Sequence, residues 1–243
     1  MKIRETIIDF ATLPAQQKHD FFQQMLEFDQ LIFPFAPVEQ LYQYVHDPEA
    51  VSVPVIQYFV GEQLIGQNIM PILKLQLQDK PIFVVTSRAG VLEQYRRSNL
   101  TLKTAIRVAL RYRLRYPAIP LWFVTTLMQP KVYTLFASRS RYFYPRKGYT
   151  MPTAHQSVLE LMHRYKSQVD KRGQGIYVAP ALMPKVTPDQ LIRLRKRSDV
   201  HYQFFMQHVP DYFDGKGLMC VCRLDFKTIS ETIMNLAFGK SVH

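Results

Sequence analysis

Two adjacent arginines, Arg96 and Arg97, lie in a short loop that joins a predicted strand to a predicted helix. The guanidinium group carries donors suited to phosphate, and the start of a helix presents unpaired N–H groups with a partial positive charge. Ser98 or Thr101 is placed to cap that helix, since a short side-chain oxygen accepts from free N–H groups. The loop Tyr95–Leu100 is therefore predicted to bind phosphate, with a solvated turn as the alternative.

The strand before this loop is predicted from Ile82–Val85, a β-branched and aromatic run that is typical of buried strands. Its continuation, Ser87–Leu92, is expected to expose N–H and C=O groups along one edge. An extended ligand binds such an edge by acting as one more strand. Gly90 in this segment fits a bulge or a close backbone approach.

The helix predicted after the loop, at residues 102–115, carries Arg107, Arg111 and Arg115 at intervals of four residues, hence on one face. This face is predicted either to bind phosphate, in a small ligand or in nucleic acid, or to be a solvated outer face. A second basic tract, Arg193–Arg197, is another candidate for contact with nucleic acid, and a solvated helix face is again the alternative.

The composition limits the classes of partner and site. The 243 residues carry a net charge of +12, which favours an anionic partner. Cys220 and Cys222 form no CxxC pattern, and the sequence has no HExxH spacing, Walker loop, Rossmann fingerprint or G-x-S-x-G elbow. No metal site is predicted. The N-terminus does not read as a signal peptide and no apolar run is long enough to span a bilayer, so a cytoplasmic protein without a transmembrane segment is expected.

The elements predicted through residue 126 follow the order strand, helix, helix, three strands, helix, strand. Short turns between the three consecutive strands indicate an antiparallel meander, and the strand–helix–strand unit after it favours a parallel pair. The strands are expected at residues 5–10, 53–60, 63–77, 81–92 and 121–126, and the helices at 15–28, 38–46 and 102–115.

The segment Val91–Arg97, with the sequence VLEQYRR, resembles the acyl-CoA signature of the GNAT acyltransferase superfamily. Arg96 matches the arginine that opens the family's R-x-x-G-x-G/A pattern. Asn99 and Thr101 stand where the two small residues are expected. Asparagine tolerates a positive φ, whereas a branched threonine crowds a pyrophosphate. The predicted element order is also that of the family's fold, and the resemblance covers residues 5–150.

The resemblance implies an acyl-CoA-dependent N-acyltransferase that moves an acyl group from a thioester to an amine by direct attack. The donor would be acyl-CoA or acetyl-CoA, or an acyl carrier protein, and the acceptor an amine-bearing molecule. In the family, a tyrosine on the helix after the fifth strand protonates the leaving thiolate; Tyr133 is the candidate, with a packed aromatic as the alternative. The residues that would bind the donor are Gly90, Val91, Arg96, Arg97, Ser98, Asn99, Leu100 and Thr101.

The resemblance also implies a fold of the α/β (α+β) type, with a mixed, mostly antiparallel GNAT-like sheet flanked by helices. Residues 1–150 would form the acyl-CoA-binding domain, and residues 151–243 a helical or mixed C-terminal extension packed on it. The predicted strand at residues 81–92 carries no carboxylate that would act as a base. Two alternatives therefore stay open: a catalytically inactive GNAT-like binding or scaffold protein, and a basic nucleic-acid-binding protein.

Overall fold

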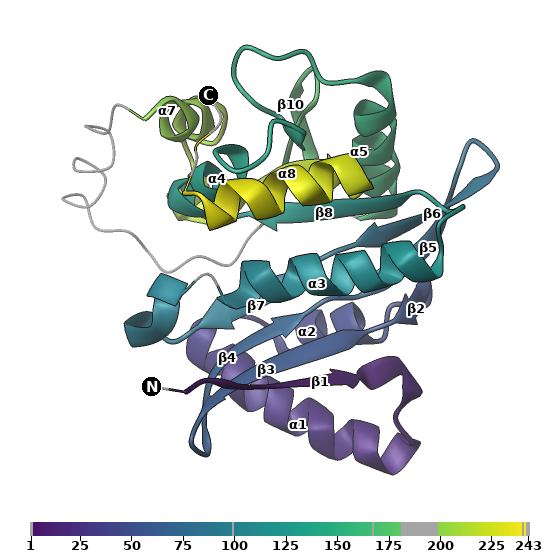
Figure 1. Ribbon diagram of the computed structural model, residues 1–243, viewed down its shortest axis with the longest axis vertical. Helices are drawn as coiled ribbons and strands as arrows, with labels where there is room; N and C mark the ends of the chain where they lie inside the picture. Colours follow the sequence, from purple (N-terminus) through teal and green to yellow (C-terminus); the bar gives the residue numbers. More distant parts are fainter. Residues whose placement is uncertain (1, 99, 167, 181–198, 240, 242–243) are drawn as a thin grey trace. The chain divides into compact units, whose positions relative to one another are not determined.

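The computed structural model describes residues 2–98, 100–166, 168–180, 199–239 and 241 (Figure 1). The chain divides into two compact units. The first unit holds residues 1–76 and 80–121, and the second holds residues 77–79 and 122–243. The boundary predicted at residue 150 falls inside the second unit. The basic tract predicted at Arg193–Arg197 lies outside the described residues.

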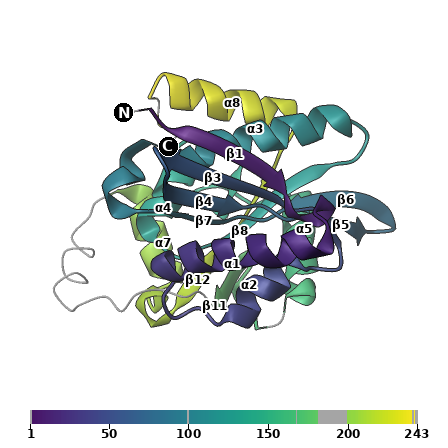
Figure 2. The ribbon, with the colours of Figure 1, turned by 90° about the horizontal axis from the view of Figure 1, so that it is seen from below.

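The central sheet of the first unit has four antiparallel strands in the order β1-β3-β4-β7, and Figure 2 shows them side by side. Gly61 joins β3 to β4 with a φ of 58°, a backbone conformation that glycine adopts without strain. β7 is the last strand of the sheet, so only one of its edges is paired in it. The four strands are β1 (Arg4–Asp9), β3 (Pro54–Val60), β4 (Gln63–Ile69) and β7 (Arg88–Val91).

Two strands that the sequence predicts as continuous are each broken. The strand predicted at residues 63–77 forms β4 and β5 (Ile72–Leu77), and the strand predicted at residues 81–92 forms β6 (Lys80–Val85) and β7. Pro71 lies at the first break. Proline has no N–H to donate to a strand ladder, so it interrupts the pairing there. Its carbonyl accepts from the backbone N–H of Thr86, at the second break, at 3.0 Å. β5 pairs instead with the short strand β2 (Ala50–Ser52).

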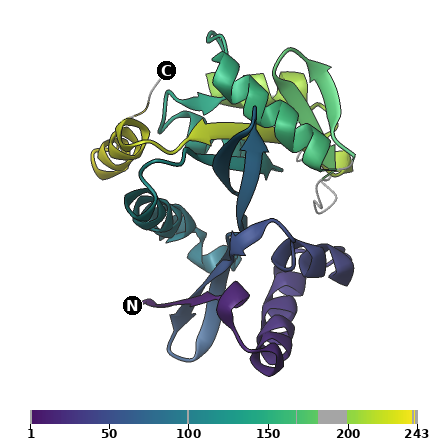
Figure 3. The same ribbon diagram turned by 90° about the vertical axis from the view of Figure 1, so that its right-hand side faces the viewer.

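The helices of the first unit are α1 (Ala15–Ile32), α2 (Val38–Val45) and α3 (Leu100–Arg115). Helices α1 and α3 lie on opposite faces of the sheet (Figure 3). Side-chain contacts agree: Gln67 Nε2 donates to the carbonyl of Met25 in α1 at 3.1 Å, and Tyr58 Oη donates to the carbonyl of Leu100 in α3 at 3.3 Å. The core between α1, α2 and the strands includes Phe10, Phe21, Phe22, Met25, Leu41, Val45, Val53, Val55 and Ile69.

The second unit is built on an antiparallel run of strands in the order β10-β11-β12-β8. β12, from the predicted extension, pairs residue by residue with β8, so the C-terminal segment continues the sheet that β8 begins. The strands are β8 (Leu121–Leu127), β9 (Phe143–Tyr144), β10 (Asp170–Gly173), β11 (Ile176–Pro180) and β12 (Lys216–Arg223). The helices are α4 (Pro130–Ala137), α5 (Thr153–Tyr165), α7 (Val200–His208) and α8 (Phe226–Ala237).

The strand pairs named above are antiparallel, and helices flank them in both units. The predicted α+β fold with a mostly antiparallel sheet is confirmed. The predicted order of elements through residue 126 is also confirmed, apart from the two strand breaks and the short strand β2, which was not predicted.

Candidate functional site

The outer edge of β7 is the first component of the candidate site. The backbone N–H of Leu92 donates to the carbonyl of Ile65 at 2.9 Å, so residues 88, 90 and 92 direct their backbone groups toward β4. The backbone groups of Ala89 and Val91 point the other way. In the sheet β1-β3-β4-β7, no strand pairs with that outer edge.

Gly90 is required by the packing of β7 against α1. A Cβ atom at this position would lie 2.6 Å from Cγ2 of Ile32, the last residue of α1. The close approach predicted at Gly90 is therefore made by the protein's own helix. A role of Gly90 toward a ligand stays a prediction.

The loop after β7 forms a 3-10 helix, η2 (Glu93–Ser98). Arg96 Nε donates to the carbonyl of Val91 at 2.9 Å, so this arginine is anchored at the outer edge of β7 while its side chain stays exposed. A guanidinium group has four further N–H donors on its two terminal nitrogens. Arg97 and Ser98 belong to the same 3-10 turn, and Asn99 lies outside the described residues.

Helix α3 starts directly after this loop, and its first turn is tied to the sheet. The carbonyl of Leu100 accepts from Tyr58 Oη at 3.3 Å and from Thr104 Oγ1 at 3.2 Å. Burial raises the pKa of Tyr58 to about 12, so its hydroxyl stays protonated and able to donate at neutral pH. Thr101 is half-buried in the same turn. The start of a 16-residue helix is thus held against Tyr58 of β3, which lies in register, through Gly66 of β4, with Val91 at the end of β7.

A polar pair on the face of the sheet toward α3 was missed in the sequence. Ser87 Oγ donates to Asn68 Oδ1 at 2.8 Å. Ser87 is half-buried and Asn68 is buried, and Nδ2 of Asn68 has no hydrogen-bond partner among the described residues. The two consecutive polar residues Gln67 and Asn68 at the end of β4 are the signal that would have identified it. The predicted strand at residues 81–92 has no carboxylate that would act as a base. The Ser87–Asn68 pair provides polar atoms there instead, since Asn68 lies opposite Ala89 in the sheet.

An ion pair fixes the start of β7 and was also missed. Arg88 donates from Nε and Nη2 to the two carboxylate oxygens of Asp29 in α1, at 2.7 and 2.6 Å. Its Nη1 donates to Gln40 Oε1 of α2 at 2.8 Å, and the ring of Phe33 lies 4.8 Å from the guanidinium carbon. Asp29 is buried. The contacts hold β7 against both α1 and α2.

Of the three arginines predicted on one face of α3, one forms an ion pair with another described residue. Arg107 forms an ion pair with Glu5 of β1, so an acidic neighbour accounts for one arginine of the predicted row. Arg111 and Arg115 are exposed on the same face. Among the described residues, neither of these two arginines forms an ion pair.

Tyr133 belongs to the second unit and is completely buried. Its hydroxyl donates to the carbonyl of Pro145 at 2.8 Å, and its ring stacks on Phe204 with the centroids 5.9 Å apart. Burial raises the pKa of Tyr133 well above its usual value, so transfer of its proton to a thiolate is uphill. The contacts of Tyr133 are those of the packed aromatic that the sequence kept as the alternative. Its role as an acid stays a prediction.

The structure therefore brings together β7, Arg96 and the start of α3 in the first unit.

Burial raises the pKa of both thiols of the second unit, Cys220 and Cys222. In the described part of the chain, no three or more His, Cys, Asp or Glu side chains gather in a way that would hold a metal ion. None of the described helices combines the length and the apolar character needed to cross a membrane.

No protein-family model matches the chain, and no curated protein matches it either. Solved structures do show similarity. One is the GNAT family N-acetyltransferase YhbS from Escherichia coli in complex with CoA, at 16% identity and a TM-score of 0.40, over 58% of this chain and 72% of that one. Another is an acyl-CoA N-acyltransferase from Pseudomonas aeruginosa, at 12% identity and a TM-score of 0.36, over 57% of this chain and 88% of that one.

A third similar structure is an Enterococcus faecalis V583 protein described as a probable N-acyltransferase, at 8% identity and a TM-score of 0.39. The match covers 58% of this chain but only 33% of that one, so the chain spans a third of that protein. The similar structures include GNAT N-acetyltransferases at low sequence identity. What those proteins bind or catalyse does not transfer to this chain at these values.

Proposed function

We propose that this chain is an acyl-CoA-dependent N-acyltransferase whose donor site is formed by β7, η2 and the start of α3. One observation carries the proposal. A strand whose outer edge is unpaired in its sheet runs directly into an arginine-containing turn and then into the start of a 16-residue helix. An edge for an extended amide-containing arm and a site for phosphate are thereby adjacent.

The phosphate end of the proposed site combines backbone and side-chain donors. The first N–H groups of α3 have no carbonyl partner inside the helix, and the helix start carries about half a positive charge. Arg96 is held beside it by its bond to the carbonyl of Val91, so less side-chain freedom is lost when it binds phosphate. Arg97, Ser98, Asn99, Leu100 and Thr101 complete the predicted phosphate loop.

The pantetheine arm of the acyl-CoA donor would lie along β7. The outward backbone groups of Ala89 and the N–H of Val91 would bond to the amides of pantetheine as a neighbouring strand does. Ala89 is exposed and small, which leaves room for such an arm. The carbonyl of Val91 already accepts from Arg96, so the hydrogen bonds to the arm would end there.

The reaction would be direct. The amine nitrogen attacks the thioester carbon, the C–N bond forms and the C–S bond breaks, the nitrogen loses one proton while the departing sulfur gains one, and no covalent enzyme intermediate occurs. The amine must be neutral, and the departing thiolate must gain a proton. Ser87 Oγ donates its proton to Asn68, so its lone pairs are left to accept from the N–H of the acceptor amine. The resemblance implies Tyr133 as the acid for the thiolate, but its hydroxyl is buried in the second unit and bonded to the carbonyl of Pro145, which gives that role no support.

Thermal-shift titration tests donor binding, because a ligand that binds only the folded chain raises its melting temperature. Acetyl-CoA, longer acyl-CoAs and CoA should each raise it. Arg96→Ala should greatly reduce the rise, whereas Lys80→Ala, which removes an exposed charge on β6, should not. The absence of a shift with millimolar CoA species and with acyl-ACP would refute the proposed donor site.

An inactive scaffold protein would have the same fold and would bind the same donor. Turnover separates the two, with acetyl-CoA and a panel of amines monitored by the release of free thiol. The enzyme releases CoA only when an amine is present. Binding without release for every acyl-CoA and acyl-ACP tested would favour the scaffold.

A further inference from the structure

Charge in the first 116 residues is strongly segregated along the chain. Residues 1–92 contain six basic and ten acidic residues, whereas residues 93–116 contain seven basic residues and one acidic residue. The positive charge of this part of the chain is therefore concentrated on η2 and α3. A basic protein with a uniformly solvated surface does not require such segregation.

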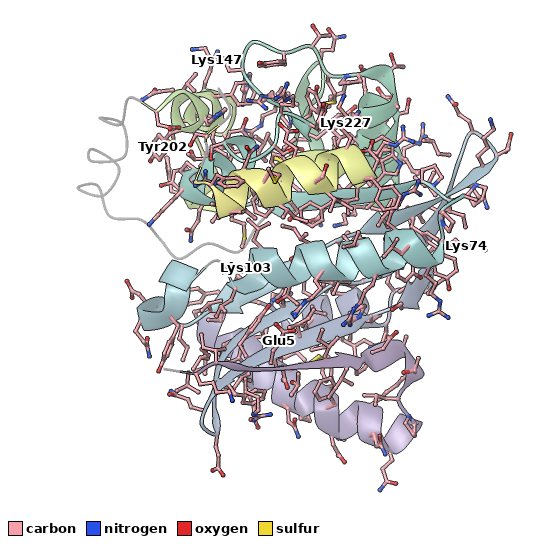
Figure 4. The ribbon with its side chains drawn as sticks, viewed as in Figure 1. Glu5, Lys74, Lys103, Lys147, Tyr202 and Lys227 are labelled. Carbon is pink, nitrogen blue, oxygen red and sulfur yellow. The ribbon has the colours of Figure 1, made fainter. Side chains whose placement is uncertain are left out.

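The segregated charge forms a row on α3. Lys103, Arg107, Arg111 and Arg115 are all exposed and follow one another at intervals of four residues, which places them on one face. With a rise of about 1.5 Å per residue, neighbouring members are separated by roughly 6 Å along the axis, and the row is about 18 Å long. Figure 4 shows Lys103 at the beginning of the helix and Glu5 beside it. We call these four residues the basic row.

Little negative charge offsets the basic row. Glu5 pairs with Arg107, whose side chain is still 50% exposed. No ion pair in the described part of the chain involves Lys103, Arg111 or Arg115. Like charges at this spacing repel one another, so the row gains free energy from an anion that lies along it.

The proposed donor does not account for the far end of the row. Arg111 and Arg115 lie roughly 16 and 22 Å from the start of α3 along its axis, well beyond phosphates held at the first turn. A membrane surface fits poorly as well. A helix that lies in a membrane buries an apolar face in lipid, whereas the apolar side of α3, with Leu102, Val108 and Ala109, is buried inside the protein.

We propose that the basic row binds the phosphate backbone of a nucleic acid. A linear array of cations fits a linear polyanion, and the contacts to phosphate would be independent of base sequence. The interaction goes beyond the proposed acyl transfer and does not depend on it. Four phosphate contacts predict a slope of log K against log salt of about −3.6 for duplex DNA and about −2.8 for a single strand.

Fluorescence anisotropy with a labelled 20-nucleotide duplex DNA and a single-stranded RNA, between 50 and 250 mM NaCl, tests the proposal. The double variant Arg111→Gln, Arg115→Gln should bind about tenfold more weakly at low salt, with a slope for duplex DNA reduced by about 1.8. The matched control Lys74→Gln, Lys80→Gln removes the same charge from exposed positions on β5 and β6. It should bind like the unaltered protein.

Three results would overturn the proposal: no binding at 50 mM NaCl, equal losses in both double variants, or binding to anionic lipid vesicles but not to either nucleic acid. Circular dichroism melting of each variant checks that the fold is intact. The thermal shift with acetyl-CoA should persist in the Arg111→Gln, Arg115→Gln variant, because Arg96 and the start of α3 are unchanged. That readout separates failure of the basic row from failure of the donor site.

Discussion

In the first unit, the buried carboxylate of Asp29 is matched by two hydrogen bonds from Arg88, and Glu5 is matched by Arg107. In the second unit, His155 and Tyr133 are buried among aromatic rings, and burial shifts the pKa of each toward its neutral form. Each of these two carboxylates of the first unit therefore has a charged partner. Burial keeps His155 and Tyr133 of the second unit in their neutral forms at neutral pH.

The difference indicates which unit is suited to bind charge. Paired charges next to exposed arginines provide the field that attracts an anion, as at η2 and α3. Groups that burial keeps neutral at neutral pH contribute packing and no net charge. The buried groups of the second unit are therefore expected to act on stability, and the charged groups of the first on binding.

The largest effect is expected from Asp29→Ala. The variant leaves Arg88 without the carboxylate that holds it, and loss of one partner of a buried pair costs roughly 3–5 kcal/mol. Urea unfolding should show a corresponding loss of stability. Arg141→Ala, which breaks an exposed ion pair with Glu231 in the second unit, is the control and should have little effect. Equal effects of the two variants would contradict the comparison.

The second-largest effect on stability is expected from the protonation of His155. Neither ring nitrogen has a hydrogen-bond partner among the described residues, and the rings of Trp122 and Tyr144 pack edge-on against it. Burial and, to a smaller extent, the charge of Arg223 lower the pKa of His155 to about 4, and Asp225 partly opposes this shift. The unfolded chain takes up a proton below pH 6.5 and the folded chain only near pH 4.

The contribution of neutral His155 to the free energy of unfolding should therefore be fully present above pH 6.5. It should decline as the pH falls toward 4, by at most about 1.4 kcal/mol per pH unit. His155→Phe should remove this part of the decline, as measured by denaturant unfolding at several pH values. A decline of the same size in the variant would show that other groups cause it.

The smallest change in stability is expected from Tyr133→Phe, which leaves the carbonyl of Pro145 without its donor and costs about 1–2 kcal/mol. If Tyr133 is a packed aromatic, kcat of the acyl transfer should be unchanged at a temperature where the variant is folded. Loss of a general acid lowers the rate by about 100-fold or more. A fall of that size in a folded variant would return Tyr133 to the reaction.

The sequence predicted what is encoded locally. Helical spacing and proline positions located the helices, and the strand–loop–helix order at residues 81–115 was correct. It did not predict the contacts between distant positions: Arg88 with Asp29, Arg107 with Glu5, or Ile32 against Gly90. Partners far apart in the chain leave no periodic pattern. Pro71 did mark a strand break, and that signal was available but overlooked.

Amide hydrogen exchange measured by NMR, with and without acetyl-CoA, tests the donor site most directly. Bound acetyl-CoA should slow exchange at the N–H groups of Ala89 and Val91, which point to the outer edge of β7. Gly90 serves as the internal control, because its backbone groups face β4 and should change little. Binding of acetyl-CoA that leaves Ala89 and Val91 unaffected would contradict the account.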